Sequence, residues 1–214
     1  MTFKKATFLI LLILLIDQIS KVYIKTHFQL GESLTVFDKF RIYFIENDGM
    51  AWGTKLSDIF PFISDRLAKL SLTLFRILAI FGIGYWLFST LQKAGSRVLI
   101  IALSFIFSGA LGNIIDSVFY GVIFDHSYAQ IASFLPKEGG YDSLFHGKVV
   151  DMLYFPLWKG YLPEWIPFYG GEFFTFFEPV FNIADVAISI GFILLIFFNK
   201  KAFPVQEAGV EQSV

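Results

Sequence analysis

Long apolar stretches alternate with polar connections along the whole chain. Four stretches are long enough to cross about 30 Å of hydrocarbon at about 1.5 Å per helical residue. They lie near residues 6–25, 67–91, 97–122 and 180–198. This pattern predicts an all-α integral membrane protein with four transmembrane helices. The first stretch could instead be a signal peptide, but no small-residue cleavage site follows it and the polar residues after it keep helical spacing.

Basic residues are clustered at three short polar segments. The clusters are Lys4 and Lys5, Lys93 and Arg97, and Lys200 and Lys201. Basic residues in short loops tend to stay in the cytoplasm, and four spans put all three clusters on one side. We therefore predict cytoplasmic N and C termini, with two long connections, near 26–66 and 123–179, on the outer side.

The two outer connections differ in pattern. In the first, residues 34–37 and 40–45 are short runs rich in β-branched and aromatic side chains, which predicts a small extracytoplasmic β element within 30–55. The second, an insertion of about 124–179, contains glycines and prolines that indicate turns rather than another span. Its many aromatic residues suit the lipid headgroup level, either as an ordinary aromatic belt or as a platform for a lipid-bearing substrate.

Composition supports a membrane location and narrows the chemistry. The 214 residues are 56% hydrophobic and 16% charged, and the mean hydropathy is +0.65. A net charge of -1 leaves no basic surface for the phosphate backbone, so nucleic acid is not an expected partner. Because the chain has no Cys, thiol nucleophiles, thiolate metal sites and disulfides are excluded.

Two aspartates stand beside apolar runs, Asp151 after two valines and Asp185 near the start of the last predicted helix. Acids near hydrocarbon are costly and therefore candidates for function. Two neighbouring carboxylates can share one proton, so one can deprotonate a water while the other donates to a carbonyl oxygen. Each acid also has a simpler interpretation, because Asn182 and Asp185 could cap a helix and Asp151 could be a solvated loop acid.

Further polar residues lie toward the predicted outer ends of the helices. Asp17 and Lys21 are four residues apart, so they share a helix face and can pair. The third predicted helix carries a stripe that would let a neighbouring backbone approach beside hydrogen-bonding groups, or would simply pack. The members of this stripe are Gly109, Gly112, Asn113 and Asp116.

Five motifs in order resemble those of one family, the lipoprotein signal peptidases or bacterial signal peptidase II. They are Asp17-Gln18-x-x-Lys21, Asn47-Asp48-Gly49-Met50-Ala51-Trp52-Gly53, Gly109-x-x-Gly112-Asn113-x-x-Asp116, Val149-Val150-Asp151 and Phe181-Asn182-x-Ala184-Asp185-x-x-Ile188. Together they span nearly the whole chain. Each motif alone is weak, but five in order on four spans make a chance match improbable.

The resemblance implies a membrane aspartyl endopeptidase that needs no metal or cofactor. It would remove the signal peptide from prolipoproteins, cutting just before a cysteine that bears diacylglycerol, and would act as a monomer on the outer face of the bacterial cytoplasmic membrane. Asp151 and Asp185 match the catalytic pair. Residues implied to bind substrate are Asn47, Gly49, Asn113 and Asn182, and those in supporting positions are Asp17, Lys21 and Asp116.

One departure from the family pattern concerns a cation. The family usually has Arg directly after the acid of the third helix, whereas Ser117 follows Asp116 here. Arg76 lies within an apolar span, where a lone guanidinium needs a partner. We predict an Arg76–Asp116 ion pair, with the alternative that Arg76 reaches the outer headgroups.

A second departure concerns spacing. In the family the first catalytic acid follows soon after the third helix, at about the place occupied here by Asp125. We prefer Asp151 because the two preceding valines preserve the local motif, which leaves residues 125–146 as an insertion.

Other classes of protein stay open at this point. Intramembrane acids and cations also mark transporters and proton pathways, although the four spans show no obvious internal repeat. A metalloenzyme using His126, His146 and nearby acids lacks a specific ligand spacing. A non-enzymatic assembly factor with four spans would not need both Asp151 and Asp185.

Overall fold

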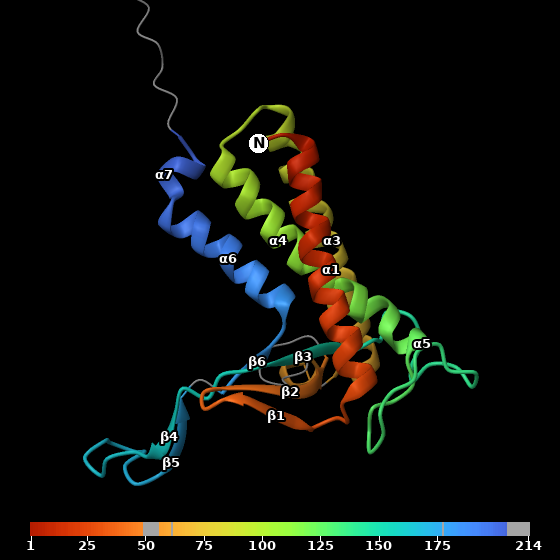
Figure 1. Cartoon of the computed structure of the whole chain (residues 1–214), viewed down its shortest axis with the longest axis vertical. Coiled ribbons are helices and arrows are strands. Elements are labelled where there is room, and N and C mark those ends of the chain that lie inside the picture. The colour runs from red at the N-terminus through yellow and green to blue at the C-terminus, as the bar shows by residue number, and fades with distance from the viewer. Residues whose placement is uncertain (49–55, 61, 177, 205–214) are drawn as a thin grey trace, which may run out of the picture.

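The computed structural model describes residues 1–48, 56–60, 62–176 and 178–204. A helical bundle carries a β-sheet at one end, and the sheet projects sideways from the bundle (Figure 1). The long helices are α1 (Phe3–His27), α3 (Asp65–Gln92), α4 (Arg97–Ile115) and α6 (Ile183–Phe197). The short ones are α2 (Leu56–Ile59), the π-helical η2 (Asp116–Tyr120), α5 (Gly121–Ile123) and α7 (Asn199–Ala202).

Three helical segments are long and apolar enough to cross a membrane: Phe3–His27, Asp65–Gln92 and Arg97–Ile123, the last combining α4, η2 and α5. They confirm three of the four predicted spans. The fourth, α6, has only 15 residues, because its start is fixed at Ile183 by the cap residue Asn182 rather than lying near residue 180 as predicted.

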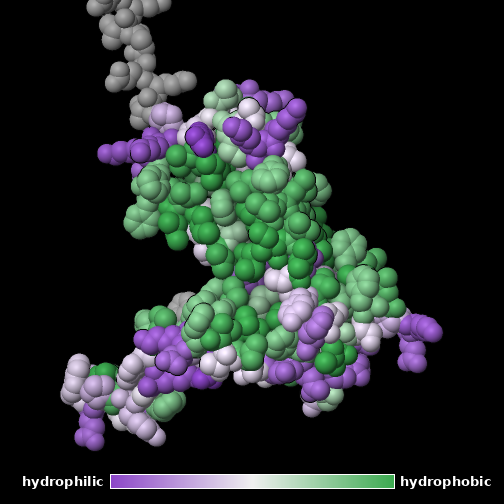
Figure 2. Space-filling model, viewed as in Figure 1, coloured by the Kyte–Doolittle hydropathy of each residue, from purple (hydrophilic) through white to green (hydrophobic). Residues whose placement is uncertain are grey.

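An apolar surface surrounds the bundle. Figure 2 shows hydrophobic residues covering the helices, with hydrophilic residues gathered at the two ends of the molecule. Large side chains such as Phe8, Leu78 and Phe81 are exposed on this surface. A soluble protein rarely exposes so continuous an apolar area, so the surface is one that lipid covers.

The outer part contains more β structure than predicted. β1 (Ser33–Phe37) and β2 (Phe40–Asn47) form the expected element, but the sheet continues as β1-β2-β3-β6. The added strands β3 (Val149–Tyr154) and β6 (Val180–Phe181) come from the second connection, for which turns but no strands were predicted. A separate hairpin of β4 (Trp158–Tyr161) and β5 (Phe173–Phe176) lies between them along the chain.

Small residues bring α4 and α6 close together, as the predicted stripe required. A Cβ on Gly109 would lie 2.3 Å from the carbonyl oxygen of Ala184, and one on Gly112 would lie 2.5 Å from an Asp17 carboxylate oxygen. Side chains do not fit at such distances, so these glycines let the backbone of α6 and the acid of α1 approach α4. The close approach confirms that the two glycines of the stripe serve packing.

The π-helical turn at the end of α4 receives the returning chain. A π turn is wider than an α turn and changes which carbonyl groups are satisfied within the helix. Here the carbonyl of Ser117 accepts from the Gly147 amide at 2.9 Å, and that of Val118 accepts from the Phe145 amide at 3.0 Å. The chain therefore returns from the insertion directly beside Asp116 and enters β3.

Candidate active site

Asp151 lies in the middle of β3 and is almost completely buried. In the register of β2 and β3, Ile45 is opposite Asp151 and Asn47 is opposite Val149, so Asn47 and Asp151 share one face of the sheet. The Asn47 amide donates to Asp151 Oδ2 at 2.7 Å. The Asn182 amide donates to Asp151 Oδ1 at 2.7 Å, so both carboxylate oxygens have a donor.

Asp185 lies in the first turn of α6. Its Oδ1 accepts from the Asn113 amide at 2.8 Å, and its Oδ2 accepts from the backbone amide of Asn182 at 3.2 Å. The Asn182 side-chain oxygen in turn accepts from the Asp185 backbone amide at 3.0 Å, which completes a capping box. The helix-cap interpretation of these two residues is therefore correct.

Asn182 can cap the helix and also contact the site, because it uses different side-chain atoms for these two interactions. Its side-chain oxygen caps the helix, while its side-chain nitrogen donates to Asp151 and, at 3.1 Å, to Asn113 Oδ1. A single residue thus connects the two aspartates from the end of β6.

A buried ion cluster lies behind the two acids. Lys21 Nζ is 3.0 Å from Asp17 Oδ2, which confirms the predicted pair on α1, and 2.8 Å from Asp116 Oδ2. It also donates to Asn113 Oδ1 at 2.8 Å. Since Lys21 has only donors, this contact fixes the orientation of the Asn113 amide and directs its nitrogen toward Asp185.

The two acids of the cluster hold the backbone next to the candidate catalytic residues. Asp17 Oδ1 accepts from the amide of Ala184, the residue before Asp185, at 2.9 Å. Asp116 Oδ2 accepts from the amide of Val150, the residue before Asp151, at 3.3 Å. Each supporting acid therefore positions one member of the pair through its neighbour in the chain.

The environment of Asp151 favours its protonated form. Burial raises the pKa of Asp151 to about 7, and the negative charge of Asp185 adds to the rise, while hydrogen bonds from Asn47 and Asn182 and the charge of Lys21 act in the opposite direction. The carboxyl group of Asp151 therefore titrates closer to neutral pH than an exposed aspartate does. It can thus accept or release a proton in the range where a general acid or base is most useful.

The pairing of Arg76 with Asp116 stays a prediction. Lys21 contacts Asp116, so this acid already has one cation as a partner. The negative charges of Asp185 and Asp151 also act on the Arg76 guanidinium, so Arg76 is a positive charge near the acid pair.

Asp125 lies in a different environment from Asp151. Its carboxylate accepts from the Ser133 amide at 2.7 Å within the insertion, and it lines a polar hollow there with His126. The structure brings Asp151, not Asp125, to the asparagines beside Asp185. Gly49, predicted to bind substrate, lies outside the described residues.

Gln18 is a site residue that the sequence interpretation missed. Its amide donates to Asp17 Oδ2 and to Asp116 Oδ1, both at 3.0 Å, and its oxygen accepts from Tyr120 at 3.2 Å. Like Lys21, Gln18 thus contacts both acids of the cluster. The signal was its place in the first motif, between Asp17 and Lys21, where no role was assigned to it.

Fold and site together define a class: a helical membrane protein with two linked aspartates, one buried and one half-buried, where the bundle meets the sheet. The family model described as signal peptidase (SPase) II matches residues 9–136 and 139–199. The chain therefore belongs to the signal peptidase II family, a family of proteases.

Individual relatives agree with this assignment. The chain is 50% identical over 190 residues to a lipoprotein signal peptidase of Porphyromonas gingivalis, covering 88% of this chain and 79% of the relative. It is 37% identical to a lipoprotein signal peptidase of Amoebophilus asiaticus over 204 residues, covering 92% and 79%. A solved bacterial membrane enzyme has the same fold, with a TM-score of 0.59 at 23% identity over 98% of this chain and 96% of that one.

Proposed function

We propose that this protein is an aspartyl endopeptidase that removes the signal peptide from prolipoproteins, cutting just before a cysteine modified with diacylglycerol. The substrate class follows from the named relatives, and the catalytic type rests on the acid pair. The observation that carries it is the connection of Asp151 and Asp185 through Asn182, together with a pKa of Asp151 near neutrality.

In the proposed reaction the pair holds one proton and positions a water molecule. The ionised carboxylate takes a proton from water as the water oxygen bonds to the scissile carbonyl carbon, and the protonated carboxyl group donates a hydrogen bond to the carbonyl oxygen. The C–N bond then breaks as a proton moves to the leaving nitrogen. Because the acids interact, the proton belongs to the pair rather than to a fixed member.

The asparagines support this chemistry by orienting the carboxylates. Asn47 and Asn182 donate to Asp151, and Asn113 donates to Asp185. We also propose that the side-chain amides of these asparagines form hydrogen bonds with the backbone of an extended substrate peptide, because water is scarce at this depth.

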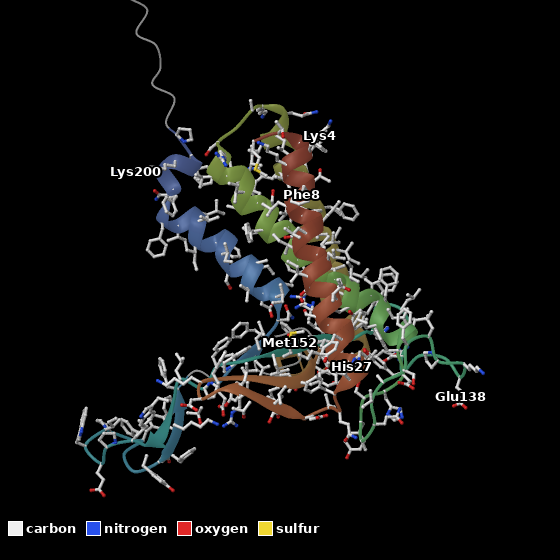
Figure 3. The ribbon with its side chains drawn as sticks, in the orientation of Figure 1. Lys4, Phe8, His27, Glu138, Met152 and Lys200 are labelled. Carbon is white, nitrogen blue, oxygen red and sulfur yellow. The ribbon has the colours of Figure 1, made fainter. Side chains whose placement is uncertain are left out.

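The proposed orientation places the acids at the outer face of the bacterial cytoplasmic membrane, with α6 as a fourth, short span. Lys4 and Lys200 lie at the end of the bundle opposite the sheet (Figure 3), in agreement with a cytoplasmic position for both termini. We also propose that the protein acts as a monomer.

The lipid of the substrate has an apolar surface to follow. A hollow of about 250 Å³ lies between the outer end of α1, the sheet and the start of α6. Its lining is almost entirely apolar and includes Met152 and Ile183, close in the chain to the two acids. We propose that the acyl chains approach along this side from the bilayer.

Substitution of either acid tests the proposal. Asp151→Asn and Asp185→Asn should each lower cleavage of a diacylated prolipoprotein by at least about a thousandfold, because each removes one member of the proton-sharing pair. The assay uses purified protein in detergent without added metal, with thermal unfolding to show that each variant is folded.

The matched control is Asp125→Asn, which removes an outer acid that is not in the pair. It should keep near-normal activity. Loss of activity in this variant with activity retained in Asp151→Asn would overturn the assignment of the pair.

A further inference from the structure

The β4–β5 hairpin has no role in the chemistry described above. Its strands pair from Trp158 with Phe176 to Tyr161 with Phe173. It is inserted between β3 and β6, so along the chain it lies between Asp151 and Asp185. In Figure 1 the hairpin lies at the far end of the sheet, displaced to the side of the bundle on which α6 lies.

Aromatic side chains cover the outside of this hairpin. Phe168, Trp165 and Tyr169 in the loop that joins the strands are 96%, 80% and 61% exposed. Further exposed aromatic residues lie on the strands themselves: Trp158, Tyr161, Phe173, Phe174 and Phe176. Scattered exposed aromatics are ordinary, but so many on one projecting element indicate a surface that another phase or molecule covers.

The loop is built to present these side chains rather than to bury them. Its base is closed by hydrogen bonds from the Leu162 amide to Glu172 and from the Gly171 amide to Leu162, each 2.9 Å. Phe168 has φ of 69°, a left-handed conformation that is unusual for a bulky residue. The ring of Phe168 is the most exposed of the aromatic side chains in this loop.

We propose that the loop of Trp165, Phe168 and Tyr169, here called the aromatic tip, inserts into the headgroup region of the outer leaflet. Trp and Tyr favour this layer because their rings are apolar and their N–H and O–H groups stay hydrated. Exposed Glu164 and Glu172 flank the tip, which limits its depth to the headgroups. The proposal rests on the orientation given under Proposed function but not on cleavage.

Geometry favours lipid over a protein partner. The sheet and hairpin extend sideways at the end of the bundle instead of continuing along the helix axes (Figure 1), so they lie over the membrane surface around the bundle. Figure 2 shows that hydrophobic residues cover the visible face of the helices above the sheet, which is the surface that we expect lipid to cover. The hairpin joins the strand that carries Asp151 to the strand that leads to Asp185, so its anchoring sets the height of the acids relative to the lipid.

Because the chain has no Cys, single introduced cysteines allow the depth of the tip to be measured. Trp165→Cys carries a nitroxide label in lipid nanodiscs, and its collisions with oxygen and with a water-soluble nickel complex are compared. Phe8→Cys, 68% exposed on α1, is the reference within the bilayer. Glu138→Cys, at the tip of the insertion on the other side of the molecule (Figure 3), is the aqueous reference.

The expected oxygen-to-nickel accessibility ratio at position 165 lies between those of the two references. A ratio equal to that at position 138 would overturn the proposal. So would spin–spin broadening that grows with protein concentration, since this would assign the tip to a second copy of the chain. Neither outcome depends on catalysis, so the cleavage proposal would stand.

A kinetic experiment tests the consequence for the substrate. Trp165→Ser with Phe168→Ser should raise KM about fivefold for a lipid-embedded substrate in proteoliposomes and leave kcat unchanged. Tyr128→Ser removes a ring that is 77% exposed on the insertion and should change neither constant. An unchanged KM in the double variant would overturn the role of the tip in setting the site.

Discussion

Two lysines one turn apart on α1, Lys21 and Lys25, are both completely buried but have different surroundings. Lys21 contacts two carboxylates and the amide oxygen of Asn113. Lys25 contacts a single carboxylate, that of Glu46 at 2.5 Å, and the hydroxyl of Ser127 at 2.9 Å. The same residue type, equally buried on the same helix, thus belongs to two separate polar clusters.

The difference shows what each cluster does. The Lys21 cluster holds the backbone next to both candidate catalytic acids, and its positive charge acts on Asp151. The Lys25 cluster joins α1 to β2 and to the insertion, and the ring of Tyr141 lies 4.9 Å from the ammonium group. We infer that the first cluster serves the acids and the second serves the attachment of the insertion.

The largest difference between the two clusters is expected in thermal stability, when Lys21 and Lys25 are replaced by Met one at a time. Lys21→Met leaves two buried carboxylates without their cation, which should lower the melting temperature in detergent by about 10 °C. Lys25→Met should lower it by only about 3 °C, because Glu46 keeps Ser127 and has Lys148 3.8 Å away. Intrinsic tryptophan fluorescence during heating measures both values.

The matched control for this comparison removes one acid as well. Lys21→Met with Asp116→Asn should recover part of the loss, since only Asp17 then stays uncompensated. Equal losses for the two single lysine variants would show that the clusters do not differ in the way inferred.

A smaller effect separates the clusters through the pH dependence of cleavage. The charge of Lys21 lowers the pKa of Asp151, so Lys21→Met should raise this pKa above about 7. Asp151 then keeps its proton to higher pH, and the limb of the kcat/KM profile that it governs moves to higher pH, whether it acts as acid or as base. In Lys25→Met the limb should not move.

This profile can be measured even in a poorly stable variant, because the fraction of folded protein changes the height of the curve and not the pH at which it bends. A limb that stays in place in Lys21→Met, or moves equally in both variants, would contradict the assigned role of Lys21.

The smallest effect is expected from Ser127→Ala. The Ser127 hydroxyl accepts from Lys25 and donates to Glu46, and its loss should lower stability by about 1 kcal/mol. Hydrogen exchange should become faster in residues 125–148 while the region around Asp185 is unchanged. Faster exchange around Asp185 would show that the Lys25 cluster also supports the acids.

Sequence patterns predicted the features that depend on local spacing. Asp17 and Lys21 pair because four residues separate them on one helix, and Gly109 and Gly112 pack because they share a face. The cap formed by Asn182 was also predicted correctly, while its role in substrate binding stays a prediction. Asp151 and Asp185 could be identified as candidates from the sequence because each stands in a short local motif.

Features that depend on distant partners were not predicted. The Lys25 cluster joins Glu46 and Ser127, which are 21 and 102 residues away in the chain. The strand β3 was hidden because five of its six residues are buried and the strand is nearly continuous in apolar character, which does not show the alternation of a half-buried strand. The contact between Lys21 and Asp116 was not predicted because it joins residues of two different helical segments.

The π turn after α4 has a consequence for how such chains can change in length. It binds the returning chain at Phe145 and Gly147, so both ends of residues 125–144 are anchored to the same turn of one helix. A Cβ on Gly147 would lie 2.1 Å from the Asp116 carbonyl oxygen, which makes this re-entry point specific for glycine. The start of β3, and with it the register of Asp151, is therefore fixed by the helix that carries Asp116 and not by the length of the exposed loop around Glu138.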